Sequence, residues 1–136
     1  MTAPLFSAVA ILRYSTTNTE YRLVAEVDMG IVDVYRALVP RAVRLNRQKY
    51  APHMTVVRRE VPPNLSAWGC HEGKLVDFQY HGYVYFDHTY YWLGAYAPGL
   101  EEIRQELGLP RTSWVTESPD AGTPFHVTIG NVKPSV

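Results

Sequence analysis

The sequence predicts a single α+β domain whose two halves, residues about 1–66 and 67–136, follow the same order of elements. Three observations support this prediction. Stretches rich in β-branched and aromatic residues indicate strands, each half has one apolar stretch with helical spacing, and each half ends in a strand with a histidine two residues before a threonine. A length of 136 residues suits one domain with its own core.

The first half is expected to begin with two strands, over residues 5–12 and 20–28, on either side of a polar turn. Apolar residues then recur at helical spacing over residues 30–42, and Pro40 is expected to end or bend this helix. The loop 44–52 follows the helix. It leads into the first histidine strand.

The second half repeats this order after a connector rich in proline. Aromatic strands are expected over residues 74–87 and 89–97. A helix then begins at Pro98, which suits a first turn, and ends before Gly108. The loop 111–124 leads into the second histidine strand.

Composition limits the class of protein. Hydrophobic residues make up 46% and charged residues 19%, which is a globular balance. No apolar run is long enough to cross a bilayer, and no basic residue precedes the apolar N-terminal stretch, so we predict neither a membrane span nor a signal peptide. Cys70 is the only cysteine, which favours a cytoplasmic protein. We do not expect its neighbour His71 to activate it, because adjacent side chains usually point apart.

Basic residues are concentrated in one part of a chain whose net charge is zero. The segment from Arg41 to Arg59 contains six basic residues and no acidic one, and it surrounds the first histidine strand. An anion would be attracted there, and Lys49 is our candidate for binding it. A solvated helix end and loop is an equally good interpretation of most of this run. The six are Arg41, Arg44, Arg47, Lys49, Arg58 and Arg59.

The two histidine strands are predicted to build one site. Alternate residues of a strand face the same way, so His53 and Thr55 share a face, as do His126 and Thr128. The opposite faces are apolar and can anchor each strand in a core. If an approximate two-fold axis relates the halves, the two polar faces meet across one cleft. The alternative is that each histidine is half-buried and bonds to a neighbouring threonine.

The motifs "HMTV" and "HVTI" resemble those of the two-histidine (2H) phosphoesterase superfamily. That superfamily includes 2′,3′-cyclic phosphodiesterases, the so-called 2′-5′ RNA ligases, and phage enzymes that destroy cyclic nucleotide immune signals. The resemblance implies two pseudo-symmetric lobes of antiparallel sheet with flanking helices and a central cleft. It also implies that His53 and His126 are catalytic and that Thr55 and Thr128 hold the phosphate. The short chain favours a small nucleotide over a folded RNA as substrate.

Histidine chemistry fits phosphodiester cleavage independently of this resemblance. One neutral and one protonated group are needed, and histidine, with an unperturbed pKa of about 6.5, provides both forms near pH 7. Threonine hydroxyls can donate to the phosphoryl oxygens, where negative charge grows. His-x-Thr is not a recognised zinc-ligand spacing, so we expect neither a metal nor another cofactor at this site.

Three aromatic residues are candidates for stacking on a base. Tyr14 follows the first predicted strand, Trp92 lies in an aromatic strand, and Trp114 lies in the loop before the second motif. Packing in the core is the alternative for each. Loops carry function more readily than strands, which favours Trp114.

The sequence therefore predicts a metal-independent phosphodiesterase that cleaves cyclic oligonucleotide signals, of the phage type that evades CBASS immunity and acts in the host cytoplasm. Alternatives are an enzyme acting on RNA ends, such as a 2′,3′-cyclic phosphodiesterase or a 2′-5′ RNA ligase-like protein, and a noncatalytic module that binds nucleotides or RNA. The expected partner is the nucleotide substrate. No membrane and no obligate protein partner are expected.

Overall fold

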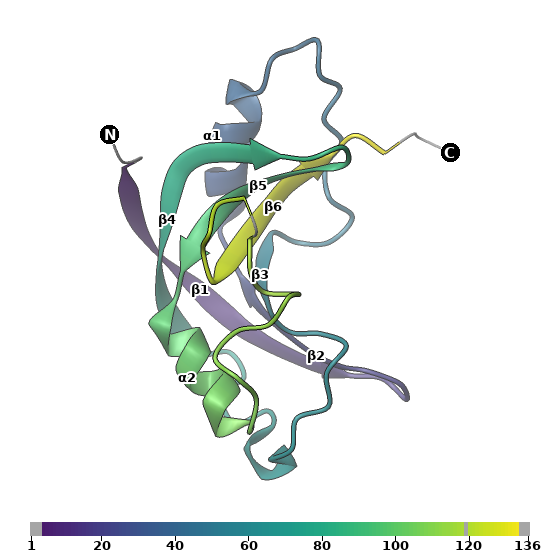
Figure 1. Cartoon of the computed structure of the whole chain (residues 1–136), viewed down its shortest axis with the longest axis vertical. Coiled ribbons are helices and arrows are strands. Elements are labelled where there is room, and N and C mark those ends of the chain that lie inside the picture. The colour runs from purple at the N-terminus through teal and green to yellow at the C-terminus, as the bar shows by residue number, and fades with distance from the viewer. Residues whose placement is uncertain (1–3, 119, 134–136) are drawn as a thin grey trace.

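The fold is a closed six-stranded antiparallel barrel with two helices, in a computed structural model that describes residues 4–118 and 120–133 (Figure 1). The strands follow one another around the barrel in the order β1-β2-β3-β6-β5-β4. The elements in chain order are β1 (Leu5–Thr16), β2 (Tyr21–Glu26), α1 (Met29–Leu38), β3 (His53–Val57), a short 3₁₀ helix η1 (Leu65–Ala67), β4 (Leu75–Phe86), β5 (Tyr90–Tyr96), α2 (Pro98–Glu106) and β6 (Phe125–Asn131).

The predicted fold class of two sheet lobes with a cleft between them is wrong. The element order β-β-α-β occurs twice, but the two sets of three strands are joined at both edges. The 12-residue strand β1 is long enough to pair with β4 over residues 5–11 and with β2 over residues 11–16. The second junction joins β3 to β6. The sheets therefore close into one barrel instead of forming separate lobes.

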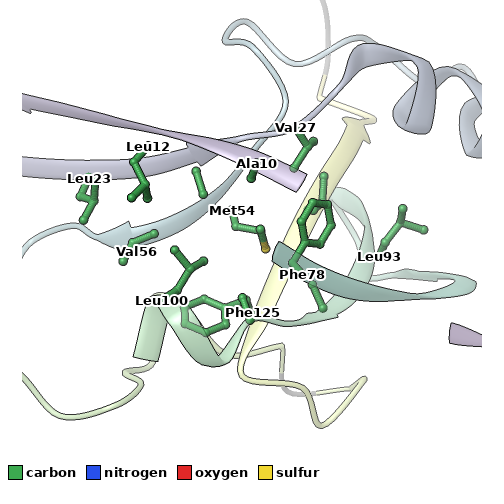
Figure 2. Close-up of a cluster of buried hydrophobic side chains, with 14 of the residues drawn as sticks. Ala10, Leu12, Leu23, Val27, Met54, Val56, Phe78, Leu93, Leu100 and Phe125 are labelled. Carbon is green, nitrogen blue, oxygen red and sulfur yellow. The ribbon is translucent and has the colours of Figure 1, made fainter. Parts of the chain in front are cut away.

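The interior of the barrel is filled by the apolar faces of the strands, as Figure 2 shows for Met54, Val56 and Phe125. The apolar residues that alternate with the histidines and threonines of β3 and β6 are all buried there. Leu100 of α2 packs into the same cluster. Because side chains alternate along a strand, the histidines and threonines face outward, away from this core.

Local sequence signals set the bounds of both helices. The side chain of Asp28 accepts a hydrogen bond of 2.6 Å from the amide of Gly30 at the start of α1, which ends at Leu38, before Pro40. Pro98 occupies the first turn of α2. In the view of Figure 1 the two helices lie toward opposite ends of the molecule. Among the described residues, no helix is long and apolar enough to cross a membrane.

Each helix holds the histidine strand of the other half through an arginine. Arg104 of α2 donates a hydrogen bond of 2.7 Å to the main-chain oxygen of Val56 in β3. Arg36 of α1 donates one of 2.9 Å to the main-chain oxygen of Ile129 in β6. Both carbonyls lie three residues after a motif histidine. A Cβ atom on Gly130 would lie 2.6 Å from Nη1 of Arg36 and 2.7 Å from the main-chain oxygen of Asn46, so this close approach requires a glycine.

Candidate active site

A single cleft of about 1010 Å³ collects the side chains of both motifs on the outer face of the barrel. His53, Thr55, His126 and Thr128 all line it. Its volume is at the upper end of the usual range for small-molecule sites, roughly 300–1,000 Å³. The cleft therefore lies over the junction of β3 and β6, and not between two lobes.

Across the junction of β3 and β6, the strand register places each histidine opposite a threonine of the other strand. Met54 pairs with Val127 in antiparallel fashion. This register sets His53 across from Thr128 and Thr55 across from His126, on the face opposite the core. Each imidazole thus lies beside a hydroxyl of the other strand. The two motifs form one mixed cluster.

Both imidazole rings are held in the same way by main-chain oxygens. Nδ1 of His53 lies 2.7 Å from the oxygen of Ala51, and Nδ1 of His126 lies 3.0 Å from the oxygen of Thr116. Because a carbonyl oxygen only accepts hydrogen bonds, each neutral ring carries its proton on Nδ1. Nε2 of each ring is then left with a free lone pair.

The environment favours the neutral form of both rings. Burial is the main cause that lowers the pKa of His53 below its ordinary value, and the positive charges of Arg22 and Arg58 lower it further. Burial also lowers the pKa of His126, and the charge of a protonated His53 adds to this effect. The two rings are therefore close enough to influence each other's protonation.

The cleft is cationic although the whole chain is neutral. Six basic and three acidic side chains line it. Four of the basic residues belong to the run identified in the sequence, and Arg41 and Arg44 of that run do not line the cleft. A negatively charged ligand is favoured at such a surface. The six basic residues are Arg22, Arg47, Lys49, Arg58, Arg59 and Lys133.

Two exposed aromatic rings border the cleft, one from the loop before each histidine strand. Trp114 is 73% exposed and Tyr50 is 58% exposed, which leaves ring surface free to stack on a ligand. Each lies near a cation. The guanidinium carbon of Arg59 is 6.0 Å from the ring centre of Trp114, and that of Arg22 is 5.0 Å from the ring centre of Tyr50.

The structure brings three of the four predicted substrate-binding residues to the cleft. Lys49 and Trp114 line it with exposed side chains. Trp92 also lines it but is only 7% exposed, and its Nε1 donates a hydrogen bond to Oγ of Ser118. Trp92 therefore forms the floor beside Thr128, its partner in the β5–β6 register, and offers no free face for stacking.

Tyr14 does not line the cleft, so the expectation that it stacks on a base there is not supported. It borders a smaller hollow of about 220 Å³, which shares His53 and Tyr50 with the cleft. Its ring packs edge-on against Trp68, with ring centres 5.0 Å apart. Burial, together with the charge of Cys70, raises the pKa of Tyr14 to about 12.

Sequence reasoning missed Arg22 and Tyr50. Tyr50 lies inside the basic run. An aromatic residue in a basic loop is the sequence signal that could have identified it as a binding residue. Arg22 lies in β2. The alternation of side chains along a strand predicts that Arg22 points outward, but it does not predict which residues lie beside it. Only the pairing of β2 with β3 brings it beside the histidines.

A buried ion pair fixes the loops at one end of the cleft. Arg104 is fully buried and makes two hydrogen bonds to the carboxylate of Glu60, of 2.8 Å and 2.9 Å. The hydroxyl of Ser113 also donates to this carboxylate. The pair thereby connects the segment that follows β3 to the loop that carries Trp114.

No protein-family model, curated protein or solved structure matches this chain.

Proposed function

We propose that this protein is a metal-independent phosphodiesterase that cleaves an oligonucleotide, with a cyclic oligonucleotide as the preferred substrate. One observation carries the proposal. Two imidazoles in the same tautomer, from two adjacent strands, line one cationic cleft, and no described residue hydrogen-bonds to either Nε2 atom. The proposal does not depend on a two-lobed fold.

In the proposed reaction, Nε2 of one neutral ring removes a proton from the nucleophile, which is water or a ribose 2′-hydroxyl. The new phosphorus–oxygen bond forms as the bond to the leaving oxygen breaks. Nε2 of the second, protonated ring gives its proton to that leaving oxygen. A bound phosphate anion favours this charged ring, because opposite charge raises the pKa of an imidazole.

The threonine hydroxyls are suited to the nonbridging oxygens of the phosphoryl group. The register sets one hydroxyl beside each imidazole, so the phosphorus can lie within reach of all four groups. A hydroxyl donates a hydrogen bond where negative charge develops in the transition state. It does so without adding a charge that would change the protonation of the histidines.

The borders of the cleft favour a substrate with more than one base. Tyr50 and Trp114 each offer an exposed ring, and stacking contributes about 1–3 kcal/mol per base. The cation near each ring can bind an adjacent phosphate. Two base platforms around one pair of histidines suit a small oligonucleotide better than a mononucleotide. The removal of cyclic oligonucleotide immune signals by a phage is the biological role that we propose for this activity.

The test is turnover in the presence of EDTA. Purified protein is incubated with 3′,3′-cyclic GMP-AMP, 2′,3′-cyclic AMP and a short RNA, and products are separated by chromatography. We expect the cyclic dinucleotide to be cleaved. Cleavage of only the other two substrates would assign the protein to RNA ends, and product formation only with an added divalent metal would contradict the mechanism.

Matched variants separate catalysis from binding. In His53→Asn and His126→Asn the amide can still donate to the main-chain oxygen that Nδ1 now contacts, but Nε2 is lost. We expect each to lower kcat by at least about 100-fold. His88→Asn, at an exposed position outside the cleft, should keep full activity. Binding of the cyclic dinucleotide by the unmodified protein without any product would instead indicate a noncatalytic module.

A further inference from the structure

A second cluster of reactive side chains lies outside the cleft. Cys70 and His71 belong to the segment between η1 and β4, and Glu106 is the last residue of α2. None of the three lines the cleft. The proposed phosphodiesterase mechanism therefore does not use this cluster.

Three potential metal-ligand atoms converge in this cluster. The Sγ atom of Cys70, a ring nitrogen of His71 and a carboxylate oxygen of Glu106 all lie within 4.8 Å of one another. Nε2 of His71 is 2.8 Å from Oε2 of Glu106. We propose that Cys70, His71 and Glu106 form a binding site for a divalent transition metal of the Zn²⁺ type.

The mixture of donors selects this class of metal. Thiolate and imidazole favour Zn²⁺ and similar ions over Mg²⁺ and Ca²⁺, which prefer oxygen ligands. Tetrahedral Zn²⁺ with ordinary bond lengths separates its ligand atoms by roughly 3.3–3.5 Å. Cys70 and Glu106 are exposed, so rotation of their side chains can bring the three donors, which lie within 4.8 Å of one another, to these separations. Three protein ligands leave a fourth position for water.

The hydroxyl of Tyr14 lies beside this cluster. Its oxygen atom is buried, and the main chain of His71 lies close enough to lower the pKa of this phenol. The charges of Cys70 and Glu106 lie close enough to act on this phenol.

Lys74 is the group that opposes metal binding. Its ammonium donates to Nδ1 of His71 at 3.4 Å, so Nε2 carries the ring proton and donates to Glu106. A metal on Nε2 moves that proton to Nδ1, and the thiol of Cys70 loses its proton to the buffer. Lys74 must then turn away, which its exposed side chain allows.

The proposed metal site lies where it can hold the segment between η1 and β4 in place. Glu72, in the same segment, already accepts hydrogen bonds from the amide of Tyr14 and from Arg13 of β1. A metal would add a link to the end of α2. Binding to the folded state alone raises the midpoint of thermal unfolding as metal concentration rises.

Cobalt substitution gives a sharp test, because Cys70 is the only cysteine in the chain. Any thiolate-to-cobalt charge-transfer absorption must therefore arise from this residue. We expect Co²⁺ to produce this absorption with saturation at one equivalent, and Zn²⁺ to displace it. His71→Gln and Glu106→Gln should each weaken the metal by at least about tenfold. Lys74→Gln should bind it more tightly.

Two results would overturn the proposal. One is the absence of thiolate-to-cobalt absorption. The other is an affinity for Co²⁺, measured by this absorption, that is unchanged in both His71→Gln and Glu106→Gln. That result would show that the thiol of Cys70 binds the metal alone. His53→Asn and His126→Asn should leave the absorption intact, so the outcome does not depend on the chemistry of the cleft. Thermal unfolding of Cys70→Ser, which should keep its fold but gain no stability from Zn²⁺, checks the same point by a second measurement.

Discussion

The guanidinium group of Arg104 donates a hydrogen bond of 2.7 Å to the main-chain oxygen of Val56, three residues after His53. Arg36 makes the equivalent contact with Ile129, three residues after His126. Each helix is thus connected to the histidine strand of the opposite half. The two arginines are positioning residues, because they hold the backbone of the strands and lie outside the cleft.

Removal of Arg104 is expected to be among the most destabilising single changes. Arg104→Ala leaves the oxygen of Val56 without its buried partner and removes both guanidinium hydrogen bonds from the carboxylate of Glu60, which is only partly exposed. Breaking such a pair costs about 3–5 kcal/mol. Urea unfolding measures this loss. Arg13→Ala, which breaks solvent-exposed pairs with Glu26 and Glu72, is the control and should lower the free energy of unfolding much less. Equal losses in the two variants would contradict the assignment.

The threonines are expected to affect the rate more than binding. Thr55→Val and Thr128→Val keep the shape of the side chain but remove a donor to the phosphoryl oxygens. One lost hydrogen bond of about 1.4–2.7 kcal/mol lowers kcat by roughly 10- to 100-fold, less than either histidine change. Steady-state kinetics on the preferred substrate measures both constants. A rise in KM with unchanged kcat would show that the hydroxyls only hold the ground state.

The exposed aromatic rings are expected to affect binding more than the rate. Trp114→Ala and Tyr50→Ala should each raise KM by roughly 5- to 150-fold, which corresponds to one stacked base at about 1–3 kcal/mol. Tyr83→Ala removes a ring that is similarly exposed but lies outside the cleft, and should change nothing. If Trp114→Ala and Tyr83→Ala behave alike, the cleft does not bind bases through Trp114.

Stability is expected to fall as the pH decreases below about 6.5. Burial lowers the folded-state pKa of both His53 and His126, so the unfolded chain binds more protons below the ordinary histidine value. The free energy of unfolding therefore decreases through that window, by at most about 1.4 kcal/mol per pH unit for each ring. The double variant His53→Asn with His126→Asn should lose this slope between pH 7 and 5. Carboxylates with lowered pKa values, such as Glu72, act only at lower pH.

The same shifts set the expected pH optimum of the reaction. The profile of kcat/KM follows the pKa values of the free enzyme, one for the base and one for the acid. Since the pKa of each histidine lies below its ordinary value, the maximum of this bell-shaped profile should lie below about pH 6.5. A maximum above pH 7.5 would be inconsistent with paired imidazoles in this environment.

The sequence predicted the elements better than their assembly. Alternation and helical spacing are local properties, and they gave the faces of β3 and β6 and the end of α1 before Pro40. Closure of the barrel depends on which strand edges pair. A strand pattern shows which side faces the core but not which neighbour it has, so the pairing of β1 with β4 could not be read from it.

The same distinction separates the site residues that were found from those that were missed. The histidines and threonines carry a local motif, and Lys49 and Trp114 lie in loops next to it. The places of Arg22, which was missed, of Tyr14, which was predicted but does not line the cleft, and of the positioning residue Arg104 depend on contacts across the fold. Tyr14 packs on Trp68, and Arg104 is buried although arginine is ordinarily exposed.

The central claim is that two imidazoles act on one phosphoryl group through their Nε2 atoms. Nitrogen NMR of the histidine rings, during titration with a phosphorothioate dinucleotide that resists cleavage, tests it most directly. We expect Nδ1 of His53 and His126 to carry a proton in the free protein, and both Nε2 resonances to shift along one binding curve. A response from only one of the two rings, or two curves with different midpoints, would contradict the account.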